Sequence, residues 1–133
     1  MVDDDALVLA SNRALLEQMG CEVTAVTNGE SALSTLATLS GKPVLVLCDL
    51  WLSDNENGID LLRRLSAVTA IPISGILVSG DIRPESVAAA KAAGFPILHK
   101  PVSPAKLRGV IMQFAWRIRE FTATELRDED SPG

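Results

Sequence analysis

The sequence predicts an α/β fold in which a parallel β-sheet carries helices on both faces. Strand-like and helix-like segments alternate five times along the chain, as in a series of β-α-β units. The run "VLVLC" at residues 44–48 is apolar without alternation, which is typical of a strand covered on both sides. The chain of 133 residues has the size of one ordinary domain. We therefore expect a single doubly wound domain.

The first half of the chain opens with a strand reduced to Met1 and Val2. A helix is predicted over residues 6–19, because its apolar residues fall on one face and Gly20 is a suitable stop. The segment "CEVTAV", residues 21–26, is predicted as a short strand. The next helix should open at Asn28 and close near Gly41.

The second half continues the alternation from the apolar strand at residues 44–48. Glycine and proline mark most of the boundaries, with proline at the first position of two helices and glycine after the end of one. The expected elements are a helix over about residues 58–65, a strand at 73–78, a helix from Pro84 to Gly94, a strand at 96–99, and a last helix capped by Ser103 and opened by Pro104.

Composition narrows the function classes. A net charge of -5 argues against a nucleic-acid partner, because phosphate backbones require clustered Lys and Arg. No apolar stretch is long enough to span a bilayer and the acidic start "MVDDDALVLA" is unlike a secretory signal, so we expect a cytoplasmic domain without membrane contact. Cys21 and Cys48 lack metal or redox spacing and are interpreted as reduced apolar fillers.

Four polar features fall at the predicted carboxyl ends of strands: "DDD" at residues 3–5, Asp49, Ser79 and Lys100. In a parallel sheet these ends meet at one edge, where ligands bind in open α/β folds. Each has a simpler interpretation on its own, namely a helix cap for "DDD", a turn for Ser79 and a solvated charge for Lys100. Asp49 is harder to explain in this way, because an apolar strand rarely ends in a carboxylate without reason.

Together, the clustered carboxylates need compensating charge. Formal charges of -3 from Asp3, Asp4 and Asp49, +1 from Lys100 and +2 from a divalent cation sum to zero. Oxygen ligands favour a hard ion, so we expect Mg²⁺, or Mn²⁺ in its place. A cation, a lysine and a hydroxyl around one carboxylate predict phosphoryl transfer, with Asp49 attacking phosphorus in line.

On the motifs "DDD", "CDL", "VSGD" and "HKP", in this order, the sequence resembles the receiver domain of bacterial two-component response regulators across residues 1–120. The resemblance implies a flavodoxin-like, five-stranded parallel sheet of order 2-1-3-4-5 with a truncated first strand. Residues 121–133 are then an acidic polar tail, interpreted as disordered. The segments "LLRRL", "LVSGD" and "FPILHKPVSPAKLR" are most similar to receivers at the C-terminus of hybrid sensor histidine kinases. The near absence of a first strand before Asp3 is a departure from the family that would fit a fragment cut from a larger protein.

The resemblance also assigns roles to the site residues. It implies that Asp49 is the phosphoacceptor and that Asp3 and Asp4 bind the metal together with Asp49 and the backbone carbonyl of Trp51. Ser79 would bond the phosphoryl group and Lys100 would pair with it. It further implies a cis bond before Pro101, and enzyme activity limited to self-phosphorylation from phosphohistidine and autodephosphorylation.

Two positions depart from the family pattern. Ile97 stands three residues before the lysine, where the family has an aromatic switch, so a rotating ring cannot report phosphorylation here. Trp51 lies two residues after Asp49, beside the path by which water would reach a phosphoryl group in this family. Our hypothesis is that its bulk slows hydrolysis, with packing over the acidic pocket as the simpler interpretation.

Output is expected by protein contact, because only about a dozen polar residues follow the last predicted helix. One apolar stripe of that helix is predicted to pack on the sheet, and Met112 and Trp116 lie off it as either scattered surface residues or a partner patch. The stripe consists of Leu107, Ile111, Phe114, Ile118 and Phe121. The expected partners are a histidine kinase or a histidine phosphotransfer protein, with a homodimer through the last strand and final helix as a further possibility.

Three alternatives remain open to different degrees. A pseudo-receiver would use the same fold only to bind proteins, and the intact Asp, Ser and Lys set argues against it. A haloacid-dehalogenase-like phosphatase needs a second Asp two residues after the first, where Trp51 stands. A nucleotide-binding Rossmann domain is weaker still, since no G-x-G-x-x-G follows a strand.

Overall fold

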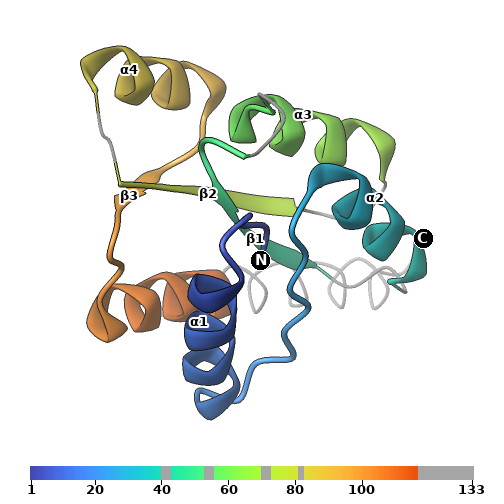
Figure 1. Ribbon diagram of the computed structural model, residues 1–133, viewed down its shortest axis with the longest axis vertical. Helices are drawn as coiled ribbons and strands as arrows, with labels where there is room; N and C mark the ends of the chain where they lie inside the picture. Colours follow the sequence, from blue (N-terminus) through green and yellow to red (C-terminus); the bar gives the residue numbers. More distant parts are fainter. Residues whose placement is uncertain (40–42, 53–55, 70–72, 81–82, 117–133) are drawn as a thin grey trace, which may run out of the picture. The chain divides into compact units, whose positions relative to one another are not determined.

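The computed structural model describes residues 1–39, 43–52, 56–69, 73–80 and 83–116 (Figure 1). The chain divides into two compact units, Met1–Val102 and Ser103–Gly133, and each is described by itself. The tail predicted at residues 121–133 and the domain end predicted at residue 120 lie outside the described residues.

The sheet of the first unit contains three parallel strands in the order β1-β2-β3 (Figure 1). They are β1 (Val44–Asp49), β2 (Ile73–Ser79) and β3 (Ile97–His99). Asp49 is paired with Val78, and Ser79 is paired with His99. All three strands therefore end at the same edge of the sheet, as the sequence predicted.

Two further segments extend this sheet by single bridges. Val2 forms parallel bridges with both Val26 and Cys48, so the spatial order expected for a 2-1-3-4-5 sheet is present. The predicted truncation of the first strand is confirmed. The strand predicted at residues 21–26 is wrong in extent, since only Val26 takes part in pairing. Its partner segment supplies only Met1 to Asp3 before α1 begins, so a longer ladder has nothing to pair with.

The helices of the first unit begin and end where local signals place them. Asp5 caps α1 (Ala6–Gln18), and Asn28 caps α2 (Gly29–Thr38) through the Ser31 N–H at 2.8 Å. Asn57 caps α3 (Gly58–Val68), which runs past the predicted end at Leu65. Pro84 opens α4 (Pro84–Ala93), and Gly94 ends it with a positive φ of 84°. The predicted end of the second helix near Gly41 lies outside the described residues.

The second unit contains a helix described over residues 104–116. Ser103 caps it as predicted, since its hydroxyl oxygen accepts the Lys106 N–H at 3.2 Å. Met112 and Trp116 are 65% and 62% exposed, in agreement with their position off the apolar stripe. Ile118 and Phe121 of that stripe lie outside the described residues.

The core of the first unit is built between the sheet and α3. Leu61 and Leu62 of α3 are fully buried, as are Cys48 of β1 and Leu77 of β2. Helices α2 and α3 lie side by side, and α1 lies on the other side of the sheet (Figure 1). This packing holds the ends of β1 and β2 in place. Among the described helices, none is long and apolar enough to cross a membrane.

Candidate functional site

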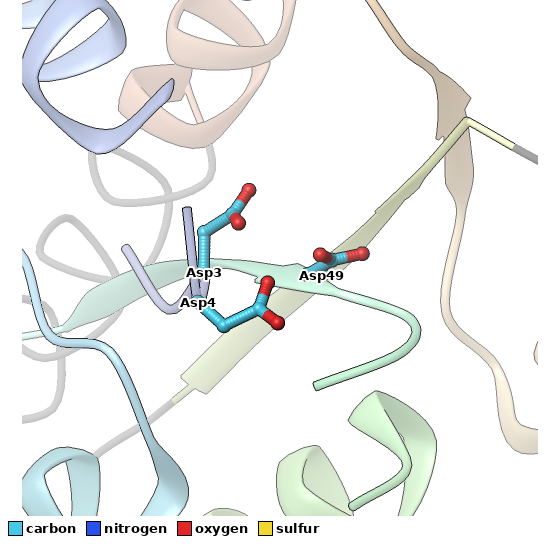
Figure 2. A group of neighbouring side chains, drawn as sticks. All are labelled: Asp3, Asp4 and Asp49. Atoms are coloured by element: carbon cyan, nitrogen blue, oxygen red, sulfur yellow. The ribbon is translucent and has the colours of Figure 1, made fainter. Parts of the chain in front are cut away.

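An acidic cluster lies at the carboxyl edge of the sheet. Asp3, Asp4 and Asp49 each offer a carboxylate oxygen, and these oxygens all lie within 4.8 Å of one another. Figure 2 shows Asp3 and Asp4 on the segment after Val2, next to Asp49 at the end of β1. Asp3 is buried and Asp4 is exposed, so the cluster opens to solvent on one side. The predicted convergence of these three residues is therefore present.

Backbone pairing places the acids. The Val2 N–H donates to the Leu47 carbonyl and the Asp49 N–H donates to the Val2 carbonyl, both at 2.8 Å. The residue after Val2 is thereby fixed beside the end of β1. Asp5 turns away to cap α1, where its carboxylate accepts the Leu7 N–H at 3.0 Å. The "DDD" run thus caps α1 with its third residue and places its first two residues in the acidic cluster.

Lys100 joins two of the carboxylates. Its Nζ lies 2.8 Å from Asp3 Oδ2 and 3.2 Å from Asp49 Oδ2. The Lys100 side chain is 23% exposed, against 8% for Asp3 and 11% for Asp49. The interpretation of Lys100 as an isolated solvated charge is therefore wrong. This lysine is a half-buried counter-ion for the acidic cluster.

The charges of the site shift two pKa values. Burial raises the pKa of the Asp49 carboxyl and Asp3 adds to it, while the charge and hydrogen bond of Lys100 offset this only in part. Burial by itself would lower the pKa of Lys100, but its hydrogen bonds and ion pairs with Asp3 and Asp49 outweigh burial and leave that pKa above its usual value. The lysine therefore stays charged at neutral pH, and further positive charge would favour ionised Asp49.

Ser79 lies at the same edge, as the last residue of β2, and is 2% exposed. Its carbonyl accepts the Lys100 N–H at 2.9 Å, which ties the position of the lysine to the end of β2. The Lys100–Pro101 peptide bond is cis, as the family resemblance implied. Ser79, Lys100 and Asp49 thus lie on three neighbouring strand ends, in the order the sequence predicted.

Trp51 lies on the loop that follows β1. Its N–H points at Asp49 Oδ1 over 3.4 Å, and its side chain is 53% exposed. About half of this residue is therefore open to solvent, and both interpretations of Trp51 stay predictions. Trp51 also forms an antiparallel bridge with Asn57, so the two ends of this loop lie together.

The donor set fits the expected cation. Asp3, Asp4 and Asp49 supply only oxygen atoms, and hard ions such as Mg²⁺ prefer oxygen ligands and bind through one or two carboxylates. One carboxylate of the cluster is exposed, so water could complete the coordination shell. Lys100 leaves the cluster short of positive charge, since it balances one of three carboxylates.

Two residues of the site were missed by sequence reasoning. The Gly58 N–H donates to the Leu50 carbonyl at 2.8 Å, and a Cβ on Gly58 would overlap the carbonyl oxygen of Asp49. Glu56, in the same loop, reaches the first residue of α2. The only signal for Gly58 was its place at a helix start, and Glu56 carried no signal, because its partner lies 27 residues away.

Ile97 is half-buried at the start of β3, opposite Leu77.

A parallel sheet with acids, a serine and a lysine at its carboxyl edge is the arrangement that the resemblance to receiver domains of signalling proteins implied. The sequence model of the response regulator receiver domain matches residues 1–112. The chain belongs to this family, the receiver domains of two-component signalling, and the predicted flavodoxin-like fold is confirmed.

Individual relatives agree with this assignment. The chain is 27% identical over 119 residues to the phyllosphere-induced regulator PhyR of Methylorubrum extorquens, covering 85% of this chain and 41% of that protein. It is similar to the receiver domain structure of a CheY-like protein from Methanospirillum hungatei JF-1, with 26% identity, a TM-score of 0.71 and 90% of each chain covered. The receiver domain of a modulated diguanylate cyclase from Desulfovibrio desulfuricans G20 is 29% identical, with a TM-score of 0.71 over 89% of this chain and 92% of that one. The chain thus spans less than half of the curated relative.

Proposed function

We propose that Asp49 accepts a phosphoryl group from a phosphohistidine on a histidine kinase or a histidine phosphotransfer protein. The observation that carries this proposal is the position of Asp49 at the end of β1, where its carboxylate shares the Lys100 ammonium with the buried acid Asp3. A carboxylate in such surroundings is a nucleophile next to positive charge, which is the arrangement that phosphoryl transfer requires.

In the proposed step, an oxygen of the Asp49 carboxylate forms a bond to phosphorus while the bond between phosphorus and the donor imidazole nitrogen breaks. The electron pair of the breaking bond returns to the imidazole, and the product is an aspartyl phosphate. Lys100 would pair with the transferred phosphoryl oxygens, and the Ser79 hydroxyl would donate a hydrogen bond to one of them.

Asp3, Asp4, Asp49 and the Trp51 carbonyl are the residues that would hold Mg²⁺, or Mn²⁺ in its place. The bound ion supplies positive charge that favours the ionised form of Asp49 and neutralises phosphoryl oxygens. Asp3 contributes in a second way, because its hydrogen bond with Lys100 at 2.8 Å keeps the ammonium at the pocket when Asp49 becomes modified.

The signal would leave the domain by contact. The Lys100 N–H bond to the Ser79 carbonyl at 2.9 Å joins the site to β3, on which Ile97 replaces the usual aromatic residue. A new charge on Asp49 would bias this connection. Met112 and Trp116 are exposed and are proposed as contact residues for a partner or a second copy of the chain. We further propose a cytoplasmic location and an origin in a hybrid histidine kinase.

Intact mass after incubation with acetyl phosphate tests the proposal. The wild-type chain should gain one phosphoryl group with Mg²⁺ and none with a chelator. Asp49→Asn should gain none, whereas Asp60→Asn, which changes an exposed acid in the first turn of α3, should behave like wild type. No gain with any divalent cation would overturn phosphorylation and favour a pseudo-receiver that only binds proteins.

A further inference from the structure

Glu56 is the most unusual charged residue near the site that the proposed chemistry does not use. It precedes α3, and its side chain is 26% exposed. Its Oε2 accepts the N–H of Gly29, the first residue of α2, at 3.3 Å. The nearest cation described is Arg64, whose Nη1 lies 3.9 Å from Oε1 and whose side chain is 60% exposed. The main partner of Glu56 is therefore the amino end of α2, where the helix dipole favours a carboxylate.

Gly29 makes room for this contact. A Cβ at Gly29 would overlap Oε1 of Glu56 and would lie 2.8 Å from its Cδ and 2.9 Å from Cδ1 of Leu61. Glycine is a poor helix former, so its use at a buried helix start needs a reason such as this close approach. The close approach of the Glu56 carboxylate to the α2 backbone thus depends on the residues at both positions, Glu56 and Gly29.

The backbone of Glu56 closes the loop that carries Trp51. The Leu52 N–H donates to the Glu56 carbonyl at 2.9 Å, and Trp51 bridges to Asn57. The Trp51 N–H in turn approaches Asp49 Oδ1. A continuous chain of contacts therefore leads from α2, through Glu56 and the base of this loop, to the phosphoacceptor.

We propose that Glu56 is a positioning residue that anchors the loop after β1 to the amino end of α2 and so sets the place of the Trp51 carbonyl and the Asp49 carboxylate for the cation. This inference rests on the proposed cation-dependent function of Asp49. The anchor works through the reach of the side chain and its hydrogen bond. The charge of Glu56 is secondary, because an amide oxygen accepts the same N–H.

Two substitutions separate reach from charge. Glu56→Asp keeps the charge but withdraws the carboxylate by one methylene, and Glu56→Gln keeps the reach but removes the charge. Mg²⁺ affinity is measured by titrating Trp51 fluorescence in a Trp116→Phe background, where Trp51 is the only remaining tryptophan. Glu30→Gln, an exposed acid in the first turn of α2, is the matched control.

We expect Glu56→Asp to weaken Mg²⁺ binding about tenfold, the lower end of effects seen when residues supporting metal ligands are changed. Glu56→Gln and Glu30→Gln should stay within about twofold of wild type, since screened charges act weakly at a distance. Equal affinity in wild type and Glu56→Asp overturns the inference. So does the reverse pattern, with Glu56→Gln weakened and Glu56→Asp normal, because that would show an effect of charge alone.

Failure of the proposed function gives a different result. If wild type binds no Mg²⁺ and gains no phosphoryl group, the function falls, and the anchor is judged in the cation-free protein by amide hydrogen exchange. Faster exchange of the Gly29 and Leu52 amides in Glu56→Asp, with wild-type rates in Glu56→Gln, keeps the anchor. Unchanged exchange at both amides overturns it.

Discussion

Lys100→Met tests how the acidic cluster is held together without a cation. In the wild type, the ammonium lies 2.8 Å from Asp3 and 3.2 Å from Asp49. At an effective dielectric constant of about 20, these separations correspond to roughly 6 and 5 kcal/mol of attraction. Two carboxylate oxygens no more than 4.8 Å apart repel by at least about 3.5 kcal/mol on the same scale. Desolvation of three charged groups cancels most of the remainder.

The expected loss of folding stability in Lys100→Met is therefore smaller than these Coulomb energies. Removing one partner of a buried ion pair costs about 3–5 kcal/mol, and the 23% exposure of Lys100 reduces this to about 2–4 kcal/mol. In thermal unfolding of a domain this size, that corresponds to a fall in Tm of roughly 10 °C without cation. Lys91→Met, an exposed lysine in the last turn of α4, should change stability by less than about 0.5 kcal/mol.

Addition of Mg²⁺ sharpens this test. In Lys100→Met the cation no longer competes with the ammonium for Asp3 and Asp49, so Mg²⁺ should raise the Tm of the variant more than that of wild type. Unfolding followed by circular dichroism with saturating Mg²⁺ and with chelator measures both differences. A loss below about 1 kcal/mol, or a smaller Mg²⁺ shift in the variant than in wild type, would refute the argument that Lys100 is the counter-ion of a buried acid pair.

Three further changes probe the same edge of the sheet. Gly58→Ala should lower the free energy of unfolding, measured by chemical denaturation, by about 1–3 kcal/mol, because the new Cβ overlaps the Asp49 carbonyl. The control Gly109→Ala, whose Cβ meets nothing within 4 Å, should leave that free energy unchanged or raise it. Equal effects of the two substitutions would contradict the close approach at Gly58. Burial raises the folded-state pKa of Asp49, so the stabilisation by this group is complete below its ordinary pKa and is lost as the pH rises through the raised value. In the absence of cation, Asp49→Asn should therefore unfold at a higher temperature than wild type at pH 7, and this difference in Tm should disappear below about pH 4. A difference in Tm that does not depend on pH would show that ionisation of Asp49 is not its cause. Trp51→Asn should shorten the lifetime of the proposed aspartyl phosphate, because the bulk of a residue two positions after Asp49 no longer limits the access of water. Intact mass after removal of the donor follows this lifetime, and an unchanged lifetime would reject that role.

The sequence allowed prediction of most elements, because each carries its own local signal. Residues 44–48 form a strand through a continuous apolar run, and Asn28, Pro84 and Gly94 begin or end helices by capping and backbone geometry alone. The strand at residues 21–26 was overestimated because strand length depends on the partner. Val26 finds only the short segment at Val2, and no pattern within residues 21–26 records this.

The residues of the candidate site likewise fall into those that a local sequence signal locates and those that it does not. Asp49 and Lys100 could be brought together from the sequence, because each ends or follows a strand and parallel strands end at one edge. The roles of Gly58 and Glu56 could not, since they depend on atoms of the Asp49 backbone and of α2 that no spacing rule locates. The convergence of Asp3, Asp4, Asp49 and Lys100 was thus predictable from the sequence, whereas the backbone contacts around them were not.

If Asp49 accepts a phosphoryl group as proposed, the electrostatics of the pocket also give a reason for both a lysine and a cation. Lys100 alone leaves the pKa of Asp49 above its ordinary value, so the nucleophile is incompletely compensated. A cation without the lysine would balance the resting carboxylates but leave the phosphoryl group that arrives on Asp49 short of positive charge. Because Lys100 contacts Asp3 as well as Asp49, it can give up the second contact to the phosphoryl oxygens and keep the first. Under the proposed function, division of the ammonium between two acids would therefore allow Lys100 to stabilise the site before and after transfer.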